Sequence, residues 1–178
     1  MTVIHANDPT TKFLSTLYNT RDDISMLLNE SSTNSDVQKA ICQDNSVMML
    51  GHGNQYGLFS RPNKKGKYDR FMITDRHVQF LRDKTCIGIC CFANLFAEKY
   101  GLSGLFSGMI VSEIDEATEL HISTTKEEID NEMYKFVYRM RYCIEHYGLE
   151  EVPMRMKDLD NRHSCLTTFN YSNLFFLK

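Results

Sequence analysis

Two apolar stretches decide the fold of this chain, and each ends in side chains that can carry chemistry: Ser46-Val47-Met48-Met49-Leu50-Gly51-His52-Gly53 and Thr85-Cys86-Ile87-Gly88-Ile89-Cys90-Cys91-Phe92-Ala93. Continuous apolar runs of this length are typical of strands buried on both faces of a parallel sheet. In such sheets, ligands and chemistry lie at the carboxyl ends of the strands. We therefore expect an imidazole and a thiol at the same edge, the pair that a cysteine nucleophile with a histidine base requires.

The rest of the chain alternates short apolar runs with helical segments. This pattern predicts an α/β protein, a three-layer sandwich in which helices flank a mostly parallel sheet. A length of 178 residues suits one domain, 1–178, with a sheet core at about 3–112 and C-terminal helical and tail elements at 113–178. We expect strands at 3–6, 23–29, 47–50, 86–90 and 108–112, a hairpin from 56–59 and 71–74, a long helix at 124–147 and an aromatic edge strand within 166–177.

Composition narrows the function classes. The net charge of −3 provides no basic field, so we expect no nucleic-acid partner, and the basic cluster at 61–67 is interpreted as a solvated loop. No apolar run approaches the ~20 residues that span a bilayer, and residues 1–6 lack a secretory pattern, so we expect a cytoplasmic protein with reduced thiols and no membrane partner. The sequence indicates no cofactor, and Cys86, Cys90 and Cys91 lack the Cys-x-x-Cys spacing of a zinc site.

The chemistry of a thiol at neutral pH sets what the site must contain. Only a few per cent of an ordinary cysteine is thiolate, and a neighbouring imidazole raises that fraction and later protonates the leaving amine. Gly53 lacks a Cβ, so its backbone N–H can approach a developing oxyanion. Because side chains alternate along a strand, Cys86 and Cys90 share a face, and Cys91 is opposed to them or lies just past the strand end.

The order of these motifs resembles that of the caspase-like cysteine peptidases, which include caspases, metacaspases, gingipains and clostripain. In caspases the second block reads Ala-Cys-x-Gly, with the histidine roughly 50 residues upstream. Here Cys90-Cys91-Phe92-Ala93 matches that block, except that Ala93 replaces the glycine, and His52 lies 39 residues before Cys91. The resemblance covers about 3–112 and is to compact bacterial-type members. It implies His52 as general base and acid, Cys91 as nucleophile, and the N–H groups of Gly53 and Cys91 as oxyanion donors.

The resemblance also implies where a substrate would bind. The pocket for the residue before the scissile bond would be formed by loops that carry Asp8, Glu113 and Asp115. Three carboxylates there would favour a Lys or Arg side chain of a protein or peptide substrate, although helix-start capping explains the same residues. Similar bacterial domains are effectors of stress response and antiviral defence, and a small-molecule or protein activator could order the segment 54–67. The aromatic tail could pair across a homodimer or close the sheet.

Two other functions fit parts of the pattern. In the first, the chain is a non-enzymatic or ligand-gated α/β sensor or interaction domain whose cysteines only pack, and slow alkylation of the thiols would indicate it. In the second, Gly88-Ile89-Cys90 resembles the strand-to-helix elbow of class I glutamine amidotransferases, with Cys90 as nucleophile of an amidotransferase-like hydrolase. That elbow needs a small residue where this chain has Phe92, and the downstream histidines lack the His-x-Glu pattern.

Overall fold

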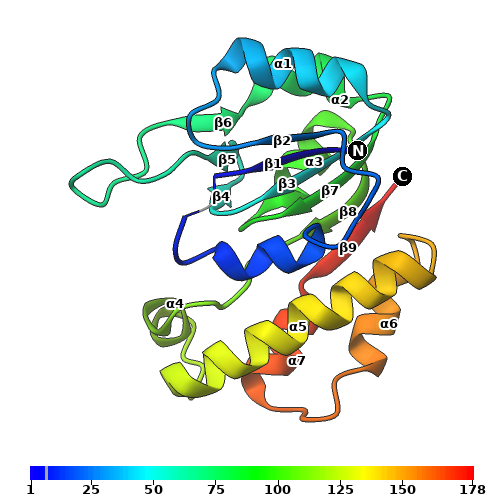
Figure 1. Cartoon of the computed structure of the whole chain (residues 1–178). Helices are drawn as coiled ribbons and strands as arrows, with labels where there is room; N and C mark the ends of the chain where they lie inside the picture. The colour runs from blue at the N-terminus through cyan, green and yellow to red at the C-terminus, as the bar shows by residue number, and fades with distance from the viewer. Residues whose placement is uncertain (7) are drawn as a thin grey trace.

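The computed structural model describes residues 1–6 and 8–178. A six-stranded sheet with the order β2-β1-β3-β7-β8-β9 forms its centre (Figure 1), and every neighbouring pair is parallel except β8 with β9. The α/β class with a mostly parallel sheet is therefore confirmed. The strands are β1 (Thr2–His5), β2 (Met26–Leu28), β3 (Ser46–Leu50), β7 (Thr85–Ile89), β8 (Ser103–Ser107) and β9 (Leu174–Leu177).

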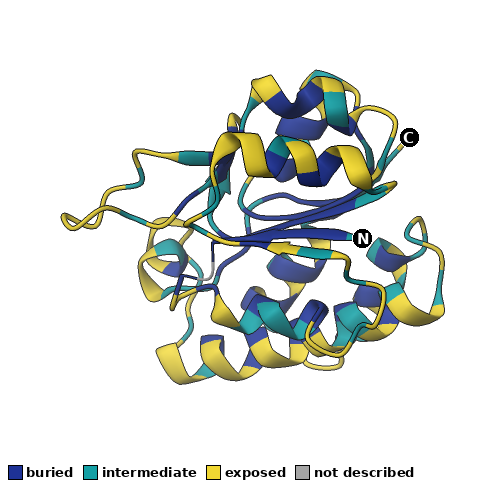
Figure 2. Cartoon of the chain, turned by 45° about the horizontal axis from the view of Figure 1, so that its top comes forward, coloured by how far each residue is buried: buried dark blue, intermediate teal, exposed yellow. Residues whose placement is uncertain are grey.

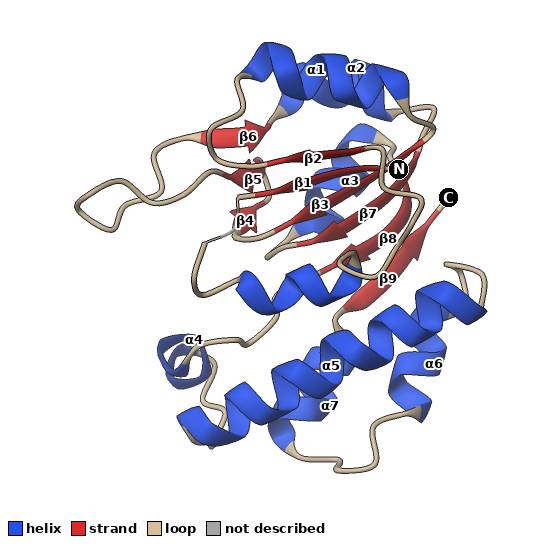
Figure 3. Cartoon of the chain, viewed as in Figure 1, coloured by secondary structure: helices blue, strands red, loops and turns tan. Residues whose placement is uncertain are grey.

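Helices cover both faces of this sheet (Figure 3). One face carries α1 (Asn34–Gln43), α2 (Val78–Leu81) and α3 (Ala93–Tyr100). The other face carries the 3-10 helix η1 (Lys12–Leu17), α4 (Ile114–Glu119), α5 (Lys126–His146), α6 (Val152–Asp158) and α7 (Cys165–Ser172). A second 3-10 helix, η2 (Asp75–His77), leads into α2.

The core lies in two layers, one on each face of the sheet (Figure 2). Because side chains alternate along a strand, β3 supplies Val47 and Met49 to one layer and Met48 and Leu50 to the other. Burial on both faces explains why its sequence is apolar without a break. No helix within the described ranges has both the length and the apolar character needed to cross a membrane.

A small antiparallel sheet follows β3. It contains β4 (Gly53–Asn54), β5 (Gly57–Phe59) and β6 (Phe71–Ile73), so the predicted hairpin is confirmed and gains one further short strand. The connection between β5 and β6 projects from the body of the molecule (Figure 1). Its last part returns Tyr68 to the carboxyl end of β3, where the ring packs on His52.

The predicted strand at 108–112 is wrong. The strand is β8, at Ser103–Ser107, and the apolar residues that follow it form a loop. Asn170 explains why this loop is buried without a strand partner: its side-chain oxygen accepts the N–H of Val111 at 2.8 Å, and its amide donates to the Val111 carbonyl at 2.9 Å. One side chain thus satisfies the backbone groups that a neighbouring strand would otherwise pair.

The predicted edge strand is confirmed only at its end. Most of the aromatic tail forms α7, and the strand β9 is limited to Leu174–Leu177. Ser164 starts the helix by accepting the N–H of Thr167 at 3.2 Å, and Tyr171 then packs edge-on against Phe136 of α5. A good N-cap and a buried aromatic contact outweigh the β-propensity of the aromatic residues.

Candidate active site

The site begins where two neighbouring parallel strands end. Leu50 of β3 pairs with Ile89 of β7, and the N–H of Gly51 donates to the Ile89 carbonyl at 3.2 Å. The residues that follow leave the sheet side by side, and the structure brings His52 and Cys91 together on the wall of one small cavity of about 30 Å³. Its other lining residues come mainly from η1, the loop after β8 and α5: Thr11, Phe13, Leu14, Gly51, Ile89, Cys90, Ile110, Ser112, Met133 and Phe136.

Cys91 lies in the turn between β7 and α3. Phe92, the next residue, has a left-handed backbone with φ of 60°, and its N–H donates to the Gly108 carbonyl at 3.2 Å. Burial raises the pKa of the Cys91 thiol to about 11, a backbone hydrogen bond from Ile110 opposes this rise, and the charge of Glu116 adds to it. The thiol is therefore protonated at neutral pH in this arrangement, and an attack by sulfur requires a base that removes the proton.

Cys90 points to the opposite side of the sheet. It is 8% exposed and belongs with Cys86 to the core layer under α1, α2 and α3, so the predicted shared face is confirmed. Burial raises the pKa of the Cys90 thiol far above its usual range. Gly53 lies directly against it, because a Cβ on Gly53 would be only 2.7 Å from the Cys90 sulfur. The contact with Cys90 is a reason for glycine at position 53 that the sequence did not reveal.

His52 is held by two residues that sequence reasoning missed. Its Nε2 lies 2.6 Å from the Thr10 hydroxyl oxygen, and its ring packs on Tyr68 with a centroid separation of 5.0 Å. Tyr68 stacks in turn on Phe59 of β5 at 5.2 Å. Burial, with the charges of Asp8 and Glu113, raises the pKa of Tyr68 to about 12. The only sequence signal for Thr10 was its place just after β1, whose carboxyl end lies at the same edge of the sheet.

The three candidate substrate carboxylates do not converge. Asp8 is 5% exposed, and its Oδ1 accepts the Thr10 N–H at 2.9 Å and the Thr10 hydroxyl at 2.6 Å, so it anchors Thr10 rather than facing a substrate cavity. Asp115 is exposed in the first turn of α4, and Glu113 alone of the three lines the larger cavity described next. In the described part of the chain, no three or more His, Cys, Asp or Glu side chains are grouped as metal ligands.

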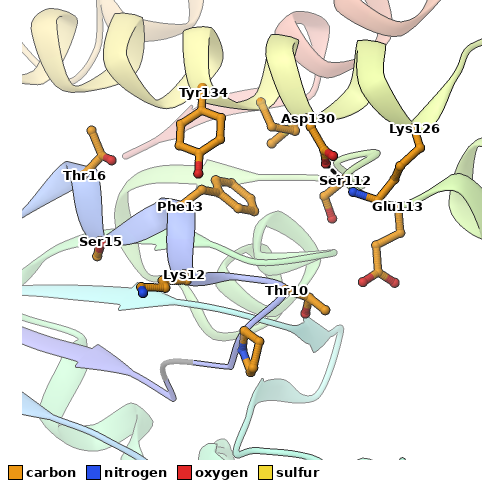
Figure 4. A pocket seen from close by; sticks show the side chains of 12 residues that line it. Thr10, Lys12, Phe13, Ser15, Thr16, Ser112, Glu113, Lys126, Asp130 and Tyr134 are labelled. Carbon is orange, nitrogen blue, oxygen red and sulfur yellow. Dashed lines mark hydrogen bonds and ion pairs between the residues drawn. The ribbon is translucent and has the colours of Figure 1, made fainter.

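A larger cavity of about 610 Å³ (Figure 4) shares Phe13, Ser112 and Met133 with the small cavity that His52 and Cys91 line. It lies between η1, the loop that carries Ser112 and Glu113, and the first half of α5. Figure 4 shows Phe13 and Tyr134 facing one another, the Lys126–Asp130 ion pair on one wall, and the Glu113 carboxylate free of that pair. Thr10 borders this cavity and also binds His52, so the two features are continuous. The lining residues are Pro9, Thr10, Lys12, Phe13, Ser15, Thr16, Ser112, Glu113, Lys126, Asp130, Met133 and Tyr134.

Comparison of this chain with protein-family models, with curated proteins and with solved structures found no match. The geometry of the site itself is therefore the basis for a function.

Proposed function

We propose that the protein is a cysteine endopeptidase of the caspase-like type, with Cys91 as nucleophile and His52 as general base and acid. The observation that carries this proposal is the placement of both side chains on one cavity wall, at the carboxyl ends of adjacent parallel strands. Thiol and imidazole are the two groups that acyl transfer by a cysteine needs, and the strand ends are where α/β folds place their chemistry.

The proposed reaction follows from the protonation state of the thiol. His52 takes the Cys91 proton as sulfur attacks the peptide carbonyl carbon, and the imidazolium then gives that proton to the leaving amine. Water hydrolyses the resulting thioester and restores the free thiol. Backbone N–H groups of Gly53 and Cys91 are the proposed donors to the oxyanion. A thiol whose pKa is raised depends strongly on such a base, because very little thiolate exists before substrate binds.

The larger cavity supports a preference for Lys or Arg before the scissile bond. Phe13 and Met133 provide an apolar wall for the methylene groups of a long basic side chain. Glu113 provides the carboxylate for its charged end, while Lys126 is already neutralised by Asp130. The preference therefore depends on Glu113 rather than on the three carboxylates together.

A panel of peptide reporters with Arg, Lys, Asp or Asn before the leaving group tests both parts of the proposal. We expect cleavage of the Arg and Lys reporters, loss of cleavage in Cys91→Ala and its retention in Cys90→Ala. Glu113→Gln should raise KM for the basic reporters several-fold more than Asp115→Asn, because Asp115 lies outside the cavity. Equal rates for Arg and Asp reporters would remove the proposed preference, and full activity in Cys91→Ala would remove the proposed nucleophile.

A second candidate function is a ligand-gated or non-enzymatic sensor domain. The raised pKa and partial burial of Cys91 favour it, since a packed thiol needs no partner for catalysis. Contact between Tyr68 and His52 connects the two candidates, because an activator that moves the projecting loop would also free the imidazole. Cleavage of reporters by the isolated protein supports the peptidase, whereas binding of a ligand without cleavage supports the sensor. An amidotransferase-like reaction at Cys90 is least supported, because its sulfur is covered by Gly53.

A further inference from the structure

We propose that Asp8 and Thr10 are positioning residues that hold His52 as its Nε2–H tautomer and so present Nδ1 as the base. The role of Nδ1 in catalysis rests on the proposed function. The tautomer itself does not, because it follows from hydrogen bonds present in the protein without substrate.

Counting protons along the chain of hydrogen bonds gives the tautomer. A threonine hydroxyl has one proton to donate, and an ionised carboxylate can only accept. The Oδ1 of Asp8 lies 2.6 Å from the Thr10 hydroxyl oxygen, so the hydroxyl proton is directed to Asp8. The same oxygen lies 2.6 Å from the Nε2 of His52, and it must therefore accept the Nε2–H. In a neutral imidazole the other nitrogen then carries no proton.

Asp8, at the start of this series of hydrogen bonds, is held in place by its neighbours. Asp8 is nearly fully buried, and its backbone carbonyl accepts the Thr11 N–H at 3.0 Å and the Thr11 hydroxyl at 3.2 Å. Behind Thr11 lies His5, with Nε2 at 3.4 Å from the Thr11 hydroxyl and Nδ1 at 3.1 Å from the Tyr18 hydroxyl. The segment that presents Thr10 is thus connected to β1 and η1 by side-chain bonds.

A different residue, Tyr68, contacts the face of the His52 imidazole. Tyr68 packs on one face of the His52 ring, with the two ring centroids 5.0 Å apart. Thr10 fixes the edge of the ring and Tyr68 fixes its plane. When His52 takes up a proton during the reaction, the carboxylate of Asp8 lies one hydroxyl group away from its ring. This arrangement serves the same purpose as the third group that orients a catalytic base elsewhere.

Nitrogen-15 NMR of histidine-labelled protein tests the tautomer without any assay of activity. His52→Gln assigns the signals, and spectra are recorded at alkaline pH, where imidazole side chains are neutral. We expect the wild type and Thr10→Ser to show His52 with a protonated Nε2 and an unprotonated Nδ1. Thr10→Val, which keeps the shape and removes the hydroxyl, should show a mixture of tautomers. Thr168→Val, at an exposed position of α7, is the matched control. A protonated Nδ1 in the wild type, or an unchanged spectrum in Thr10→Val, overturns the proposal.

Reporter kinetics then test the consequence for catalysis. Because Thr10 also borders the larger cavity, kcat and KM must be measured separately. We expect Thr10→Val to lower kcat about 10- to 100-fold, part of the 10²–10⁴-fold that general acid–base catalysis supplies, while Thr10→Ser keeps most of the activity. An active wild type with an unchanged kcat in Thr10→Val refutes the positioning role alone. An inactive wild type refutes the proposed peptidase, and the NMR result still decides the tautomer.

Discussion

The buried histidine beside the site predicts a specific loss of stability in acid. His5 is 1% exposed, and burial lowers its pKa from 6.5 to about 4, although a backbone hydrogen bond with Thr11 and the charges of Glu30 and Asp8 oppose the shift. Between these two pKa values the unfolded chain binds the proton and the folded chain does not. The free energy of unfolding therefore rises with pH in this window and falls as the pH drops from 6.5 towards 4.

The size of the effect follows from the same two pKa values. Each pH unit between them changes the free energy of unfolding by about 1.4 kcal/mol, so His5 accounts for a loss of about 3 kcal/mol across the window. Urea unfolding of the wild type and of His5→Gln at several pH values measures it. His5→Gln is less stable at pH 7 because it loses buried hydrogen bonds, but its stability should fall less on acidification.

A control separates His5 from the other groups that titrate in the same range. His77 is also buried with a lowered pKa, so it makes the free energy of unfolding fall in the same direction on acidification. The pH dependence of each variant is therefore compared with that of the wild type, which contains both histidines. His146→Gln, at an exposed position, should keep the full wild-type pH dependence. If His5→Gln loses as much stability as the wild type between pH 6.5 and pH 4, His5 is not neutral in the folded protein and the reasoning is wrong.

Three further predictions concern the glycines and the thiol. Gly104→Ala should destabilise the folded protein by more than about 3 kcal/mol, because the new Cβ would lie 1.8 Å from the Cys86 carbonyl oxygen. Gly101→Ala is the control, since a Cβ at that position meets nothing within 4 Å. If Gly104→Ala lowers Tm no more than Gly101→Ala does, this prediction is wrong. Gly53→Ala should cost about 1–3 kcal/mol through its clash with the Cys90 sulfur, and an unchanged urea midpoint argues against it. Alkylation of Cys91, measured against Cys91→Ala, should accelerate about tenfold per pH unit towards pH 11; a rate that levels off below pH 8 excludes the raised pKa.

The centre of the fold was predictable because its signal is local. The segments that became β3 and β7 are continuously apolar, and burial on both faces requires that pattern. The strand β8 was missed because Ser103-Gly104 breaks such a run. Gly104 is required there by the close backbone of β7, and nothing near it in the sequence indicates this. The loop after β8 has the apolar sequence of a strand and was predicted as one. Its backbone is instead bound by the side chain of Asn170, which lies far away in the sequence.

The candidate site could likewise be predicted only in part from the sequence. His52 and Cys91 could be placed at one edge from the sequence, because parallel strands deliver their ends together. The role of Thr10 could not, since it depends on a contact with His52, which lies 42 residues later in the chain. Asp8 was expected to face a substrate, but a carboxylate and a hydroxyl two residues apart can bind each other, and here they do. Local sequence patterns show which residues reach the edge, and the loops decide what each residue touches.

The clamp by Asn170 has a consequence for the order in which the molecule is made. Val111 is bound by a residue 59 positions later, and β8 pairs with β9 at the very end of the described chain. During synthesis, which proceeds from the N-terminus, β1, β3 and β7 emerge well before α7 exists. The loop that borders Cys91 acquires its backbone partner only after the segment that forms α7 has been made. A nascent chain therefore carries the histidine and the cysteine before it carries the clamp, and the wall of the cavity is complete only once Asn170 has been made.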